Sequence, residues 1–417
     1  MRRFIYIMIY TGIISIVLVL VTSFVLRNYG VRFAITSPPV LMNLFILGYT
    51  VIGVHLYYDG VYYFLGSDFE PYLKYLYFVI NIFNVIFVGV FLLSLKMWRV
   101  SRRTNFEYKV TSSFLVVYAT PLFAYAALRL SLLSELSNPL LNLVMIFFNS
   151  LIPIIGYAFL RSVRFSRYFL VGFVLLAIIF GFRYRIVLLL LPIGLYYFIQ
   201  RFQSLKSRVI LFSSIFGAVL LIAIVGVTRE YSTGLELSKL DGLSVIDILI
   251  HGVFNDTSTA LVSGAVIDQI RVSGRFVGFE QFYYILAYFV PSSIWENKEY
   301  SPIFSYVAQV TGQYANESGA AVLGFVEYYH TAGYFGVVIF AIGLSVVLSR
   351  LYKAAAYGTS YDVFFYLVIA AWFINSLTRG YFPQNFQDLA SLYLGLKLIK
   401  MKISSTSFRL FPSRRTA

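Results

Sequence analysis

The sequence predicts an all-helical polytopic membrane protein with about eleven membrane helices (a range of roughly 10 to 12) and one long, partly helical external loop. Three observations carry this prediction. The 417 residues are 59% hydrophobic and only 12% charged, whereas soluble domains are about half apolar and a quarter charged. The mean hydropathy is +0.80. Several uninterrupted apolar runs are long enough to cross the ~30 Å hydrocarbon core of a bilayer.

The apolar runs define the expected membrane helices in order. They cover residues 4–26, 38–58, 72–95, 111–133, 139–160, 168–182, 186–200, 209–227, 334–352, 361–378 and 386–399. The first run lacks a small-residue cleavage site, so we interpret it as a retained membrane helix rather than a signal peptide. The sixth and seventh runs are short and meet at Arg183–Arg185, which leaves open a hairpin or a broken, re-entrant pair.

The positions of Lys and Arg predict the orientation. Basic residues concentrate in the loops near 96–109, 161–167, 201–208 and 350–353 and in the tail after 397. All of these fall on one side if the helices alternate, and that side is expected to be cytoplasmic. Residues 1–227 then form an N-terminal membrane bundle, 228–331 an external cap, and 332–417 C-terminal membrane helices with a basic tail. The orientation of the N-terminus stays open, because Arg2 and Arg3 balance Arg27 and Arg32.

Composition also excludes several classes of function. The chain has no cysteine and three histidines, which argues against disulfides, thiolate chemistry and a histidine-rich metal centre. The net charge of +15 lies mostly in short loops, so nucleic acid is not an expected partner. We find no glycine-rich phosphate loop and expect no cofactor.

The external segment contains two helical patterns. Between residues 244 and 271, Asp247, His251 and Asn255 recur at helical spacing and share one face. The simpler interpretation is a helix lying on the membrane surface with one solvated side. Residues 281–290 form a second apolar piece, too short to cross a bilayer, which ends at Pro291.

Four arginines lie where a neutral residue would be less costly, at the external ends of membrane helices. They are Arg183, Arg185, Arg229 and Arg379. Such positions oppose the usual bias of positive charge toward the cytoplasm. Guanidinium groups bind phosphate in a bidentate manner, so these residues are candidate ligands for a diphosphate. The alternative is that each extends to lipid headgroups or pairs locally.

Glu327 and His330 are separated by one helical step just before the ninth apolar run. Either is a candidate general base at the membrane surface, and the alternative is an interfacial polar pair flanked by tyrosines. Asp68 and Glu70 have a spacing that could hold a divalent ion, but two acids alone predict an exposed loop rather than a metal site.

Several motifs resemble those of the Wzy-type O-antigen polymerases, which polymerise oligosaccharide repeat units. They are Pro291-Ser-Ser-Ile-Trp295-Glu-Asn-Lys298, Ser318-Gly-Ala and Glu327-Tyr-Tyr-His-Thr-Ala-Gly-Tyr-Phe-Gly336. The arginine turns at Gly181–Arg183 and Thr378–Gly380 also resemble family motifs. The likeness covers residues 180–385 in patches.

The resemblance implies a GT-C-like membrane glycosyltransferase of lipopolysaccharide biosynthesis in the bacterial inner membrane, with its long loop in the periplasm. It would transfer a growing glycan from undecaprenyl diphosphate to the non-reducing end of a new lipid-linked unit, without a nucleotide sugar. Arg183, Arg185, Arg229 and Arg379, with Trp295 and Lys298, would bind substrate, and His330 or Glu327 would be the base. The family also allows a chain-length regulator protein as a partner.

Two other functions remain open on the sequence. An O-antigen ligase would use the same donor with a different acceptor, and sequence separates it poorly from a polymerase. A flippase or other transporter of lipid-linked sugars would place charged residues along a central path, whereas here they gather at one face and in one loop.

Overall fold

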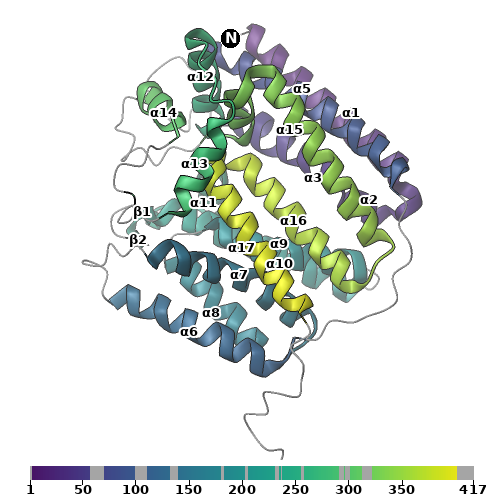
Figure 1. Cartoon of the computed structure of the whole chain (residues 1–417), viewed down its shortest axis with the longest axis vertical. Coiled ribbons are helices and arrows are strands. Elements are labelled where there is room, and N and C mark those ends of the chain that lie inside the picture. The colour runs from purple at the N-terminus through teal and green to yellow at the C-terminus, as the bar shows by residue number, and fades with distance from the viewer. Residues whose placement is uncertain are drawn as a thin grey trace, which may run out of the picture.

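A computed structural model describes residues 2–56, 70–98, 110–131, 140–179, 183–201, 205–230, 234–235, 237–254, 258–290, 295, 301–311 and 322–401. Its regular structure is helical apart from one short antiparallel pair, β1 (Arg229–Glu230) with β2 (Gly234–Leu235). Figure 1 shows the long helices side by side in one bundle.

The helices in the first part of the chain are α1 Arg2–Leu26, η1 Arg27–Tyr29, α2 Val31–Ile35, α3 Pro38–Phe45, the π-helix η2 Ile46–Ile52, α4 Gly53–Leu56, α5 Glu70–Met97, α6 Ser112–Ser131, α7 Leu140–Leu160, α8 Ser166–Ile179, α9 Arg183–Arg201 and α10 Leu205–Thr228. Those that follow are η4 Leu237–Leu240, α11 Val245–Phe254, α12 Ser258–Ser273, α13 Glu280–Phe289, α14 Ile303–Thr311, α15 Gly324–Ala356, α16 Ser360–Thr378 and α17 Phe382–Lys400.

Each apolar run of the sequence coincides with a helix or, for 38–58, with the consecutive α3, η2 and α4. In the described part of the chain, five helical stretches are long and apolar enough to cross a membrane: Tyr6–Tyr29, Pro38–His55, Pro71–Met97, Gly324–Ala356 and Ser360–Thr378. The protein is therefore a helical membrane protein. The apolar stretches of other helices are shorter, such as Ile146–Leu160 of α7 and Ile215–Thr228 of α10. The 14 residues of α8 extend about 21 Å at 1.5 Å per residue, less than the ~30 Å of a bilayer core.

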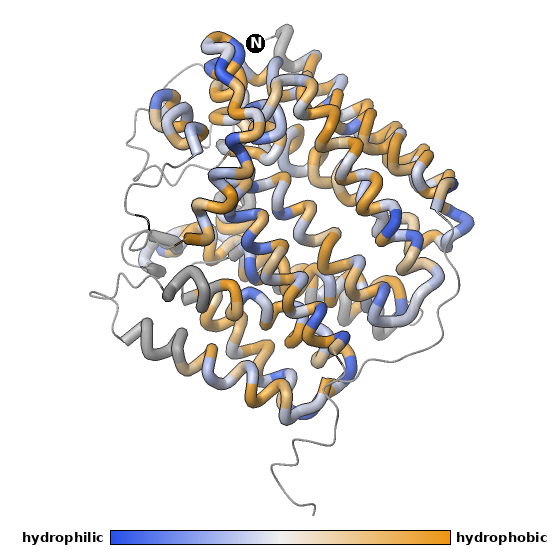
Figure 2. Tube along the Cα trace, viewed as in Figure 1, coloured by the Kyte–Doolittle hydropathy of each residue, from blue (hydrophilic) through white to orange (hydrophobic). Residues whose placement is uncertain are grey.

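Helix α1 lies on the outside of the bundle and presents exposed apolar side chains from Tyr6 to Val25. Figure 2 shows this helix, with α5 and α15, as largely hydrophobic, with hydrophilic residues at helix ends. Tyr10, Leu20 and Phe24 of α1 are 63%, 64% and 64% exposed. An apolar face of this length is suited to contact with lipid.

The interior of the bundle is closely packed and held by a few polar bonds. Helices α5 and α15 run together, and the Ser345 hydroxyl donates to the carbonyl of Phe87 at 2.9 Å. Asn43 of α3 and Asn84 of α5 exchange two amide hydrogen bonds of 3.0 and 2.6 Å. Hydrogen bonds of this kind hold membrane helices together, because the hydrophobic effect is weak between helices in lipid.

The helix ends that carry the basic residues lie together on one side of the bundle. Lys353 Nζ, near the end of α15, donates to the carbonyl of Leu95 near the end of α5 at 2.5 Å. Arg32 Nη1, from the first connection, reaches the carbonyl of Ile199 near the end of α9 at 3.5 Å. The first connection is thus on the same side as the later basic ends.

Helix α15 is kinked about a quarter of the way along, at its ninth and tenth residues of 33. Ala332 and Gly333 leave the helical conformation, and Gly333 has a φ of +60°. A kink leaves carbonyls of the preceding turn without their usual partners. Here the amides of Val277 and Gly278 donate to the carbonyls of His330 and Thr331 at 3.0 and 2.8 Å. The short first part of α15, with Glu327 and His330, is therefore joined to the α12–α13 connection.

The described helices between α10 and α15 pack on the bundle, α11 on α10, α12 on α5 and α13 on α17. The helix expected over 244–271 is divided into α11 and α12, and the intervening 255–257, with Asn255, lie outside the described residues. Ser244 and Asp247 form a capping box at the start of α11, in which Asp247 Oδ2 accepts from the Ser244 amide at 3.0 Å and hydroxyl at 2.6 Å. Helix α12 packs against α5 and α14, with Val266 and Ile270 fully buried. It is thus part of the core rather than a helix on the membrane surface.

Candidate functional site

Arg185 is the third residue of α9 and is buried, with 4% of its surface exposed. Its guanidinium carbon is 5.3 Å from the ring centroid of Tyr184 and 6.0 Å from that of Phe148 on α7. A buried guanidinium is costly unless aromatic faces or acids compensate it. The aromatic contacts provide part of that compensation.

Arg379 reaches the same tyrosine from the other end of the chain. It lies in the turn between α16 and α17, and its guanidinium carbon is 5.5 Å from the Tyr184 ring centroid. The turn is fixed by its backbone: the Gly380 amide donates to the carbonyl of Val322 at 2.6 Å, and Asn385 Nδ2 donates to the carbonyl of Arg379 at 2.6 Å. A side chain at Gly380 would collide with the backbone of Leu323. Arg379 is therefore held in place rather than extended into solvent.

Asp388 completes the group. It is buried on α17 and interacts electrostatically with both Arg185 and Arg379. Asn149 Nδ2 on α7 donates to its Oδ1 at 2.9 Å. We refer to Tyr184, Arg185, Arg379 and Asp388 as the arginine cluster. The cluster carries two cationic groups and one carboxylate, so it retains a net positive charge that suits a multiply charged anion.

The end of α13 covers the arginine cluster. Burial raises the pKa of Tyr288 well above its usual range, and the neighbouring Tyr184 and Asp388 raise it further while Arg185 opposes them. The opposite face of α13 is apolar and exposed, with Phe279 at 90%, Phe282 at 61% and Leu286 at 68%. One short helix thus joins a charged site to an apolar surface.

Glu327 is completely buried close to the Arg379 turn. Its Oε2 accepts from Gln281 Nε2 on α13 at 3.2 Å, and its Oε1 accepts from the Phe382 amide, the first of α17, at 3.2 Å. The carboxylate also lies near the positive end of the α17 dipole. Glu327 therefore connects α13, α15 and the start of α17, next to the turn that carries Arg379.

His330 is also buried, at 1% exposure, but its ring contacts α14. The Tyr306 ring is 5.6 Å from it in a T-shaped arrangement. Among the described residues its Nδ1 has no hydrogen-bond partner. Glu327 and His330 thus point to different neighbours, although they lie on the same helical segment.

The other residues proposed from the sequence are described in part or not at all. Arg183 begins α9 and Arg229 pairs with Leu235 through β1 and β2, but their side chains and Lys298 lie outside the described residues. Trp295 is described; its ring is 5.4 Å from that of Tyr283 on α13 and 37% exposed. Within the described residues no group of three His, Cys, Asp or Glu side chains is placed to hold a metal ion.

Sequence reasoning proposed Arg185 and Arg379 but missed Asp388. A usable signal was present, since Asp388 is the one carboxylate in the apolar run 386–399, and an ionisable residue within a membrane helix usually has a functional partner. No protein-family model matches the chain, and neither a curated protein nor a solved structure does.

Proposed function

We propose that the protein is a polymerase of lipid-linked oligosaccharide repeat units, a glycosyltransferase that uses no nucleotide sugar. The observation that supports this most is the convergence of Arg185 and Arg379 on Tyr184, at the start of α9 and of α17. The motif resemblance to Wzy-type polymerases is a further support, and it includes the turn that carries Arg379.

The proposed donor is a glycan on undecaprenyl diphosphate in the inner membrane. Its diphosphate would bind the two guanidinium groups, which offer paired N–H donors to phosphate oxygens. Its lipid would lie along the exposed apolar face of α13, which carries Phe279, Phe282 and Leu286. An amphiphilic substrate matches a helix that links a charged cluster to an apolar surface.

The proposed reaction moves the growing chain to the new unit. A hydroxyl oxygen at the non-reducing end of the acceptor attacks C1 of the donor's first sugar, and a C–O glycosidic bond forms. The bond from C1 to the diphosphate oxygen breaks, and undecaprenyl diphosphate leaves with the electron pair. The hydroxyl proton passes to a base. The arginines would stabilise the charge that develops on the leaving group.

Three side chains are candidates for the base. Glu327 and His330 come from the sequence, and Asp388 comes from the cluster. We assign the role to Asp388, because it interacts with both arginines and a base must lie within reach of the reacting atoms. Glu327 would then act as a positioning residue that holds the Arg379 turn through the Phe382 amide.

The glycolipid that accumulates when the gene is removed tests this function. Loss of a polymerase leaves single repeat units on the carrier lipid in the external leaflet and single units on lipopolysaccharide. Loss of a ligase leaves polymer on the carrier and bare core, and loss of a flippase leaves single units that enzymes added from outside cannot reach. Either of the last two results would contradict the proposal.

A further inference from the structure

A second group of polar and aromatic side chains lies away from the arginine cluster, where the end of α12 meets the start of α5 and the kink of α15. It consists of Tyr75 on α5, Asp268 and Arg271 on α12, and Tyr329 and Tyr334 on α15. We refer to these five residues as the tyrosine patch. It lies at the opposite end of α5 from Leu95, and so away from the basic helix ends.

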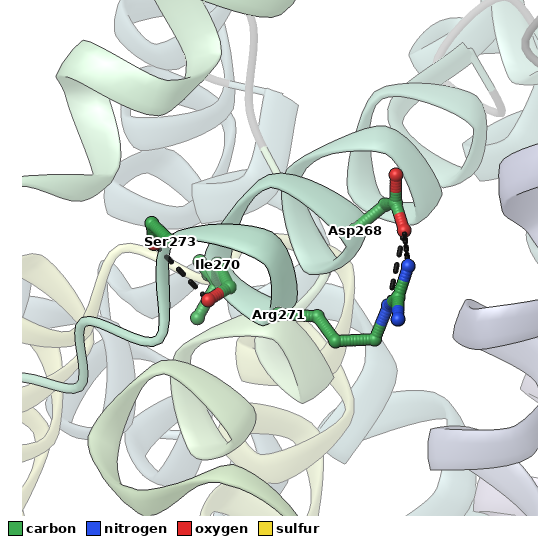
Figure 3. Close-up of polar contacts among 4 residues, drawn as sticks. All are labelled: Asp268, Ile270, Arg271 and Ser273. Carbon is green, nitrogen blue, oxygen red and sulfur yellow. Dashed lines mark hydrogen bonds and ion pairs between the residues drawn. The ribbon is translucent and has the colours of Figure 1, made fainter.

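Asp268 and Arg271 form an ion pair on the outer side of α12 (Figure 3). Arg271 Nε and Nη2 both donate to Asp268 Oδ1, at 3.1 and 2.8 Å. The Arg271 side chain is 45% exposed and the Asp268 side chain is 18% exposed. In Figure 3 the second carboxylate oxygen points away from the guanidinium. The pair therefore presents N–H donors and an acceptor oxygen next to each other.

Tyrosine rings surround this ion pair. The Arg271 guanidinium carbon lies 4.7 Å from the Tyr75 ring centroid. Tyr329 is buried, interacts electrostatically with Arg271 and Asp268, and contacts Tyr334 at a ring distance of 5.1 Å. Tyr334 is 39% exposed. The ion pair thus lies among three tyrosines, of which Tyr334 is exposed, Tyr75 is part-buried and Tyr329 is buried.

Lys74 Nζ also lies 4.8 Å from the Tyr75 ring centroid, but the Asp268 carboxylate makes the ion pair itself a better site for a neutral ligand than for an anion. Binding a phosphate would require Arg271 to give up its two hydrogen bonds to Asp268, or would place the carboxylate beside a second anion. Binding a neutral sugar ring requires neither the loss of these hydrogen bonds nor the approach of two negative charges. Its hydroxyls both donate and accept, which matches the paired Asp and Arg, and its apolar C–H face packs on an aromatic ring.

We propose that the tyrosine patch binds a sugar ring of a glycan chain. This inference rests on the proposed function and names a part of it, because the patch would hold the acceptor glycan while the arginine cluster holds the donor diphosphate. Tyr329 lies two residues after Glu327, whose carboxylate accepts from the Phe382 amide at the start of α17. The first turns of α15 therefore connect the two sites.

The experiment uses the full chain in phosphatidylcholine nanodiscs, free of sugar-headed detergent. The probe is the water-soluble oligosaccharide released by mild acid from polyprenyl-diphosphate lipids of cells that lack the gene, and saturation-transfer NMR measures its binding. Tyr75→Ala and Asp268→Asn should each weaken binding by at least about fivefold. Tyr75→Phe, which keeps the ring, should bind nearly as well as the wild type. Tyr168→Ala, at a 78% exposed tyrosine elsewhere, should have no effect.

Three results would overturn the proposal. The first is wild-type protein that does not bind the oligosaccharide, and the second is patch variants that bind it equally well. The third is a patch whose substitutions instead change the affinity for an anionic lipid, measured in a second set of nanodiscs that contain phosphatidylglycerol, which would make it a headgroup site. An Arg185→Ala/Arg379→Ala variant should still bind the oligosaccharide. Glycan binding in a protein that polymerises nothing would uphold the patch and refute the proposed function, so the two failures are distinguishable.

Discussion

Asp388 is a carboxylate on an otherwise mostly apolar helix, buried between two arginines and the amide of Asn149. If it is the base, Asp388→Asn should lower kcat by about 100-fold or more, because general base catalysis typically contributes that much. The acid limb of the pH–kcat profile should also disappear. The measurement is the initial rate of glycan polymerisation between pH 5 and 9.

A purely electrostatic role for Asp388 predicts a different pattern. If the carboxylate only orients the arginines, Asp388→Asn would mainly raise KM for the donor, and the acid limb would persist. Asn149→Ala is the matched variant: it removes the donor to Asp388 Oδ1 but keeps the carboxylate. It should therefore retain the acid limb and lose less activity.

For single residues, the sequence indicates which ones carry a charge at an unusual position, but not which of them contact each other in the fold. Arg185 and Arg379 are conspicuous because each is a charge at the end of an apolar run. Their convergence on Tyr184 depends on how α9, α16 and α17 pack, which no local pattern encodes. Glu327, a candidate base at the membrane surface, is completely buried among other side chains, and Gln281 and the Phe382 amide donate to its oxygens.

Among the elements, α17 and α7 approach so closely that Gly395 lies against Ser150 and Pro153. Gly395→Ala should destabilise the protein by about 1–3 kcal/mol through overpacking, measured as a lower Tm in detergent. It should also reduce polymerisation, because Asp388 lies two turns earlier on the same face of α17.

Gly343 of α15 provides the control for that substitution. It is exposed, and nothing lies within 4 Å of the position that a Cβ atom would take there. Gly343→Ala should leave the stability unchanged or raise it by up to about 1 kcal/mol, since Ala is the better helix former. Equal Tm values for the two variants would contradict the α7–α17 packing.

The apolar runs predicted the positions of the helices well, but the sequence pattern predicted poorly where a helix is interrupted. The apolar runs became helices because a chain in lipid must satisfy its backbone within each segment. The periodic pattern over 244–271 did not reveal the division into α11 and α12. The run beginning at residue 334 did coincide with the kink in α15, since Gly333 has a φ that favours glycine.

For the whole molecule, the basic helix ends lie on one side: the Lys353–Leu95 and Arg32–Ile199 bonds join them in pairs, and the Tyr29–Tyr352 ring contact joins the pairs. We predict that this side is cytoplasmic. The chain has no cysteine, so single cysteines report the topology directly. Met97→Cys should react with an impermeant maleimide only after spheroplasts are permeabilised, and Asp241→Cys should react in intact ones. Labelling of both from the same side would refute the predicted orientation.

The overall class of the molecule could be predicted from the sequence, but its functional centre could not. Composition and apolar runs predict a helical membrane protein, because both reflect the free energy of transferring the segments of the chain from water into lipid. The arginine cluster and the tyrosine patch depend on contacts between segments far apart in the chain. The tyrosine patch in particular gives no local signal, since tyrosine is common throughout this sequence.

The most direct test of the central claim is polymerisation by the purified protein in nanodiscs, with lipid-linked single repeat units as the only substrate. We predict a ladder of longer glycans on the carrier lipid and release of undecaprenyl diphosphate, both lost in Arg185→Lys/Arg379→Lys, because lysine keeps the charge but not the bidentate geometry. The Arg164→Lys variant, at a basic helix end, should make the same ladder as the wild type. An absent ladder with the wild-type protein, or an unchanged ladder with the double variant, would contradict the account.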